Sequence, residues 1–172
     1  MVGDRRTGSE LPLILVLSGD EAVRCGLVGD IAHRFGADYA VTAAATPVAA
    51  PERLGLQASA GARTALVVID ERLGNPPPAD FLRRVHQLQP QAKRVLLIER
   101  GNYSYRHPAV SIMALGQVDY YMSNPWFPLE RILYPGISEF LAAWDTSRDA
   151  PRVAVRTVGR PTARGRTRSG TC

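Results

Sequence analysis

Cysteine is scarce in this chain of 172 residues, which holds only Cys25 and Cys172. The two lie far apart and form no C-x-x-C pair, so the sequence indicates neither a disulfide-based scaffold nor a zinc site. The longest apolar run, 11–17, is much shorter than the roughly 20 residues that span a bilayer, and no small-residue cleavage site follows it. These absences argue against a transmembrane helix and a secretory signal peptide. We therefore expect a cytoplasmic protein that contacts no membrane.

Excess positive charge is missing from most of the chain, although the formal net charge is +5. Residues 1–145 hold 14 Lys and Arg against 15 Asp and Glu, whereas residues 146–172 hold seven Arg against one Asp. The tail has no aromatic residue, and nucleic-acid-binding domains tend to combine a basic folded surface with aromatic side chains. We expect 146–172 to be a basic tail or truncated linker, and nucleic-acid binding through it is the weaker alternative.

Residues with the spacing of common catalytic centres are also lacking. His33, His86 and His107 fall on three separate predicted elements without metal-ligand spacing. No glycine-rich run followed by Lys and Ser or Thr occurs, so no nucleotide-binding loop is predicted. The pattern favours a domain that is not an enzyme and that needs no resident cofactor.

Short apolar runs of strand length are what the sequence does contain. Runs that are apolar at every position predict strands buried on both faces, as in a parallel sheet covered by helices. Three clear runs and two weaker ones are present, at 11–17, 65–70 and 93–98, and at 39–42 and 118–122.

Segments with helical periodicity alternate with these runs. The stripe over 21–35 ends at Gly36, which predicts a glycine C-cap, and Pro135 should interrupt the last helix. The expected helices are 21–35, 51–59, 79–88, 109–115 and 129–144. This alternation predicts a doubly wound, five-stranded parallel sheet of the flavodoxin-like type with strand order 2-1-3-4-5. We expect a flexible leader at 1–10 and one domain at 11–145.

Polar residues follow the strands at the edge where open parallel sheets bind ligands. The run 65–70 ends in Asp70, the run 11–17 is followed by Ser18-Gly19-Asp20, and the run 118–122 is followed by 123–125, Ser-Asn-Pro. Together with the order of elements, these strand ends resemble the receiver domain of two-component response regulators. The resemblance covers residues 11–145.

The resemblance assigns a role to each strand end. It implies that Asp70 is the phosphoacceptor and that the acidic pair that holds Mg²⁺ falls on Ser18 and Gly19, with Asp20 next along. Only Asp70 and Asp20 then remain as metal ligands. Because Mg²⁺ requires near-octahedral oxygen coordination, we expect a weak or absent site.

The switch positions of the family are altered as well. The resemblance places the conserved hydroxyl at Ile98 and the lysine at Asn124, and it keeps an aromatic residue at Tyr121. Ile98 cannot donate a hydrogen bond to a phosphoryl oxygen, and Asn124 carries no charge to stabilise one. The sequence therefore predicts a pseudo-receiver that acts by protein–protein interaction without efficient phosphorylation. A receiver that accepts phosphate on Asp70 is the alternative.

A second resemblance concerns the end of the domain. Segments 120–126 and 152–160 are similar to receivers fused in front of thioredoxin-reductase-like flavoproteins, so a regulatory fragment of such a flavoprotein is a further alternative. The resemblance to receiver domains implies a partner or homodimer contact on the face formed by the elements at 109–115, 118–122 and 129–144. A flavoprotein disulfide reductase or a histidine kinase is the expected partner. The predicted interface residues are aromatic: Trp126, Phe127, Tyr134 and Trp144.

Overall fold

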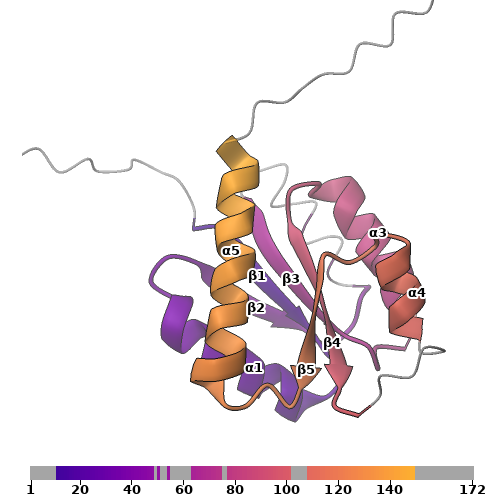
Figure 1. Cartoon of the computed structure of the whole chain (residues 1–172), viewed down its shortest axis with the longest axis horizontal. Helices are drawn as coiled ribbons and strands as arrows, with labels where there is room; N and C mark the ends of the chain where they lie inside the picture. Colours follow the sequence, from indigo (N-terminus) through magenta and orange to yellow (C-terminus); the bar gives the residue numbers. More distant parts are fainter. Residues whose placement is uncertain are drawn as a thin grey trace, which may run out of the picture.

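The computed structural model describes residues 11–48, 50, 54, 63–74, 77–101 and 108–149. Five parallel strands form one sheet in the order β2-β1-β3-β4-β5, as predicted (Figure 1). Their bounds are β1 Leu13–Leu17, β2 Ala40–Ala44, β3 Thr64–Asp70, β4 Lys93–Glu99 and β5 Tyr120–Asn124.

Helices cover both faces of the sheet, with α1 and α5 on one face and α3 and α4 on the other (Figure 1). Their bounds are α1 Glu21–Phe35, α3 Pro78–Leu88, α4 Pro108–Ala114 and α5 Tyr134–Asp149. The helix predicted over 51–59 falls mostly outside the described residues. Of that segment, Ala50 and Leu54 are helical and buried in the core on the α3 side.

The core is divided by the sheet into two layers. In β1, Leu15 packs on the α3 side and Val16 on the α1 side, because successive side chains of a strand point to opposite faces. β3 is buried along its whole length, and β1 likewise. This confirms the prediction that continuous apolar runs form strands buried on both faces.

The end of α1 differs in detail from the prediction. Gly36 has φ −65°, so it is right-handed and does not adopt the left-handed cap conformation. Its N–H donates to the carbonyl of Ala32, and a Cβ at this position would lie 2.5 Å from that carbonyl oxygen. Glycine is needed here for space and not for backbone freedom.

The last helix begins with a π-helical turn, η1 Leu129–Leu133, and α5 starts at Tyr134. Pro135, the second residue of α5, directly follows this π-helical turn, so the interruption predicted at Pro135 is a change from π-helical to α-helical winding and not a break in the helix. The helix runs on to Asp149, beyond the domain boundary placed at 145. Thr146 and Ser147, whose polarity suggested a linker, donate their hydroxyls to helix carbonyls.

A bidentate ion pair joins β4 and β5 at the amino-terminal ends of these strands. The backbone N–H and the guanidinium of Arg94 donate to the Asp119 carboxylate at 2.8 to 3.1 Å. Arg94 is buried, so its charge needs this partner. The pair joins the start of β4 to the residue before β5.

No helix among the described residues is long and apolar enough to cross a membrane. The expectations for the leader at 1–10 and for the tail after residue 149 fall outside the described part of the chain.

Candidate functional site

Asp70 lies at the carboxyl end of β3, where the sequence placed the phosphoacceptor equivalent. It is only 2% exposed, and both of its carboxylate oxygens accept hydrogen bonds. Ser18, which follows β1, donates its hydroxyl to Oδ2 at 2.8 Å. Parallel pairing of β1 and β3, with Leu17 opposite Ile69, brings these two strand ends together.

Arg72, in the turn after β3, provides the other donors to Asp70. Its backbone N–H donates to Oδ1 at 3.0 Å, its Nε donates to Oδ1 at 3.3 Å, and its Nη2 donates to Oδ2 at 3.1 Å. The hydrogen bond to Asp70, followed by the charge of Asp70, raises the pKa of the Arg72 guanidinium above its usual value. The guanidinium beside Asp70 therefore carries its positive charge at neutral pH.

Asp20, the second predicted metal ligand, serves mainly as the N-cap of α1. Its Oδ1 accepts hydrogen bonds from the N–H groups of Ala22 and Val23 at 2.9 and 3.2 Å. Its Oδ2 lies 3.7 Å from Nη2 of Arg72. Asp20 and Asp70 thus both face the same guanidinium, as the close placement of the β1 and β3 ends requires.

The donor set at this edge does not fit Mg²⁺. Arg72 lies against the carboxylates of both Asp70 and Asp20, and a cation between them would have to displace it. Ser18 and Gly19 add no carboxylate at the positions where the resemblance implies acidic ligands. Within the described ranges, no three His, Cys, Asp or Glu side chains are grouped so as to hold a metal ion.

The three switch-equivalent residues are spread over different environments. Ile98 is buried in the core layer of α3 and α4, Tyr121 is exposed on β5, and Asn124 is half-buried opposite Glu99. Arg100, which follows β4, donates its backbone N–H to the Asn124 carbonyl at 2.8 Å. Its guanidinium donates to the carbonyls of residues 125 and 127.

Two of the four predicted interface aromatics are buried in the core. Trp126 is fixed by a hydrogen bond from its Nε1 to Oδ2 of Asp30 at 2.7 Å, and Trp144 is 1% exposed. Neither side chain lies on the domain surface, where the sequence had placed a contact, because both pack in the core layer between the sheet and the helices α1 and α5. Phe127 is exposed, and Tyr134 is half-buried with an edge-to-face contact to Phe35.

Arg72 was not among the residues that the sequence indicated for this site. The available signal was its position two residues after a buried aspartate. An aspartate side chain readily accepts the N–H of the residue two positions on, and this turn brings the Arg72 side chain back onto the same carboxylate. Ser18 was considered only as a lost acidic residue, whereas its hydroxyl is a direct partner of Asp70.

Removal of the Ser18 hydroxyl should destabilise the domain measurably. We expect Ser18→Ala to lower the free energy of unfolding by about 1.5–3 kcal/mol, because a buried carboxylate loses a hydrogen bond. Urea denaturation measures the change, with Ser111→Ala on the exposed side of α4 as the matched control. Equal effects of the two variants would show that the Ser18–Asp70 contact contributes nothing.

Solved structures with a similar fold include receiver domains. The chain is similar to a CheY-like response regulator receiver domain from Methanospirillum hungatei, with TM-score 0.64 and 20% identity over 80% of this chain and 99% of that one. It is also similar to the signal receiver domain of an HD domain-containing protein from Pseudomonas fluorescens, with TM-score 0.61 and 23% identity over 84% and 97% of the two chains.

A structure described as adenylate cyclase from Rhodopirellula baltica is similar as well, with TM-score 0.64 and 14% identity over 81% of this chain and 93% of that one. No protein-family model and no curated protein sequence matches the chain. At identities this low, structural similarity establishes architecture and not activity. The chain has the fold of a response-regulator receiver domain.

Proposed function

We propose that this chain is a receiver-like signalling domain that works through protein contacts, with its phosphoacceptor position closed by an internal ion pair. The observation that supports this is the environment of Asp70, whose two carboxylate oxygens are bonded to Ser18 and to Arg72. Phosphoryl transfer to an aspartate requires a free carboxylate oxygen as the nucleophile. It also requires a cation, usually Mg²⁺, that neutralises the transferred group.

Arg72 supplies a positive charge beside Asp70, but unlike a metal ion it has no free coordination position for a phosphoryl oxygen. A guanidinium is planar and matches a carboxylate with two parallel hydrogen bonds, and here its fork is directed at Asp70. Mg²⁺ in a receiver instead presents coordination positions to both the carboxylate and the incoming phosphoryl oxygens. We infer that Mg²⁺ does not bind productively at this edge and that the domain is a pseudo-receiver.

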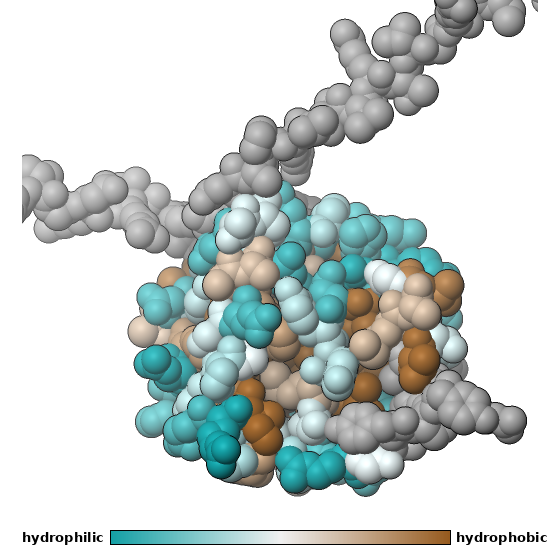
Figure 2. Space-filling view, viewed as in Figure 1, coloured by the Kyte–Doolittle hydropathy of each residue, from teal (hydrophilic) through white to brown (hydrophobic). Residues whose placement is uncertain are grey.

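The contact surface that we propose includes α4 and the edge strand β5, which follows it. Exposed apolar side chains gather over α4 (Figure 2). Leu115 at its end is 71% exposed, and Val110 and Met113 are also exposed, as is Tyr121 on β5. Contiguous exposed apolar surface is a common mark of protein interaction sites. The partner classes remain those expected from the sequence, namely a second copy, a histidine kinase or a flavoprotein disulfide reductase.

The phosphoaccepting receiver is the second candidate, and the charge of Arg72 is the observation that favours it. A guanidinium beside Asp70 supplies part of the charge neutralisation that phosphoryl transfer needs. The flavoprotein-fragment alternative depends on residues 152–160, which lie outside the described part of the chain.

Partner retention by matched variants tests the proposal. We expect Tyr121→Asp and Leu115→Asp to lose at least about nine tenths of the proteins that the wild type retains, since a charge in a desolvated contact is costly. Asp70→Asn should keep them. The measurement is quantitative mass spectrometry of proteins captured from the source cells by the folded, immobilised chain. Loss with Asp70→Asn alone would place the function in the strand-end site.

A further inference from the structure

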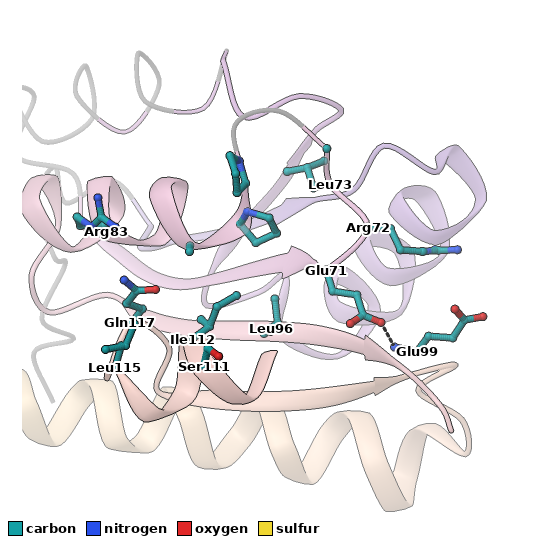
Figure 3. Close-up of a pocket in the computed structure, with 14 residues that line it drawn as sticks. Glu71, Arg72, Leu73, Arg83, Leu96, Glu99, Ser111, Ile112, Leu115 and Gln117 are labelled. Atoms are coloured by element: carbon teal, nitrogen blue, oxygen red, sulfur yellow. Dashed lines mark hydrogen bonds between the residues drawn. The ribbon is translucent and has the colours of Figure 1, made fainter. Parts of the chain in front are cut away.

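A cavity of about 730 Å³ lies between α3 and α4 over the face of β4. Its volume is within the range of about 300–1,000 Å³ that is typical of small-molecule sites. Leu96 of β4 forms the floor and Ile112 of α4 forms one wall (Figure 3). Apolar residues also continue along the α3 side, at Leu73, Pro77, Pro78 and Ala79.

Most polar groups lie at the two ends of this cavity. Gln117 and Arg83 lie at one end, Glu71, Arg72 and Glu99 lie at the other, and Ser111 lies between them beside Ile112 (Figure 3). The Glu71 carboxylate already has a hydrogen-bond partner within the protein, because its Oε1 accepts the backbone N–H of Glu99 at 2.7 Å. The side-chain carbonyl of Gln117, at the opposite end, has none among the described residues.

The backbone places Gln117 where an apolar residue is usual. Gly116 lies just after α4 with φ +64°. Its N–H donates to the Met113 carbonyl, and the N–H of Gln117 donates to the Ile112 carbonyl. This pair of hydrogen bonds is a Schellman motif, in which the residue after the glycine commonly makes an apolar contact with the last turn of the helix. Here that position carries an amide.

The side-chain carbonyl of Gln117 is buried without a hydrogen-bond partner in the described part of the chain. An unsatisfied buried carbonyl destabilises a folded protein, and an apolar residue at the same position would avoid the cost. Groups that reduce stability in this way tend to be retained where a ligand satisfies them. The unpartnered carbonyl of Gln117 and the apolar cavity beside it are therefore parts of one feature.

We propose that the cavity binds a small, mainly apolar alcohol or phenol, whose hydroxyl hydrogen-bonds to the Gln117 amide and whose body lies on Leu96 and Ile112. A hydroxyl both donates and accepts, so it satisfies the amide in either of its two orientations. The cavity opens between two helices of one sheet face. Arg72 of the Asp70 site and Leu115 of the proposed contact surface are among its lining residues, but the binding of a small molecule there requires neither phosphorylation nor a protein partner.

Paired probes test this site. We expect para-butylphenol to bind the full chain about tenfold more tightly than its methyl ether, para-butylanisole, because the ether has no proton to donate to the amide. Isothermal titration gives the two dissociation constants, and amide chemical shifts locate binding at α3 and α4. Failure of both probes to bind, or equal affinity for the two, would overturn the proposal.

Two variants separate the hydrogen bond from the apolar contact. Gln117→Met should abolish the preference for the phenol and raise Tm by about 3 °C, since the unsatisfied carbonyl is gone. Gln89→Met, at the C-cap of α3, is the matched control and should keep the preference. Ala79→Phe should fill the cavity and weaken both probes at least about tenfold in protein that melts cooperatively. A preference that survives Gln117→Met, or affinity unchanged by Ala79→Phe, would contradict the assignment.

Discussion

Val68→Asp is expected to abolish folding. Val68 is 1% exposed in the middle of β3, where it pairs with Val16 of β1 on one side and Val95 of β4 on the other. A carboxylate there would have no charged partner in the layer under α1 and α5, and burying an unpaired charge costs several kcal/mol or more. That loss is comparable with the whole stability of a typical domain, about 5–15 kcal/mol.

The same substitution at an exposed valine is the matched control. Val48, in the turn after β2, is 71% exposed, and Val48→Asp should change the free energy of unfolding by less than about 0.5 kcal/mol. Circular dichroism and thermal melting compare the two variants. A cooperatively folded Val68→Asp protein would contradict the placement of β3 at the centre of the sheet.

Trp144→Ala is expected to cost about 3–5 kcal/mol of stability, the range for large aromatic residues removed from a core. Trp144 is buried in the layer between α5 and the sheet and makes an edge-to-face contact with Tyr39, ring centroids 6.4 Å apart. The truncation would leave a cavity that this rigid layer cannot close. Urea denaturation measures the loss.

The Phe127→Ala variant is the control that shows whether the loss of stability is specific to a buried aromatic residue. Phe127 is stacked on Trp126 with ring centroids 5.9 Å apart but is largely exposed, so its removal should cost less than about 1 kcal/mol. A small loss with Trp144→Ala would return that residue to the surface role that the sequence first suggested.

The centre of the sheet was predictable from sequence because β1, β3 and β4 each contain a continuous apolar run of at least four residues. The runs at 65–70 and 93–98 match β3 and β4 within one residue at each end. The strands predicted at 39–42 and 118–122 are shifted toward the C-terminus in the structure. β5 begins and ends two residues later than predicted, because its polar residues Ser123 and Asn124 still pair with β4. Such pairing is a tertiary property, and periodicity does not reveal it.

The candidate site was predictable in position but not in its contacts. Strand ends in a parallel sheet must lie on one edge, so Asp70 and Ser18 could be placed near each other from the sequence. The direction of the Arg72 side chain depends on the turn after β3, and its importance depends on the burial of Asp70. The burial of the aromatic residues could not be predicted for a related reason. Their positions in the sequence do not distinguish Trp126, which lies in the core, from Phe127, which lies on the surface.

The state of Asp70 after exposure to a phosphodonor tests the central claim most directly. The folded chain is incubated with acetyl phosphate and Mg²⁺, beside a receiver domain that accepts phosphate from the same reagent, and the intact masses are measured at once. Because Ser18 and Arg72 occupy the Asp70 carboxylate, the mass of this chain should stay unchanged while that of the control receiver rises. Stoichiometric gain of one phosphoryl group in this chain, lost in Asp70→Asn, would contradict the account.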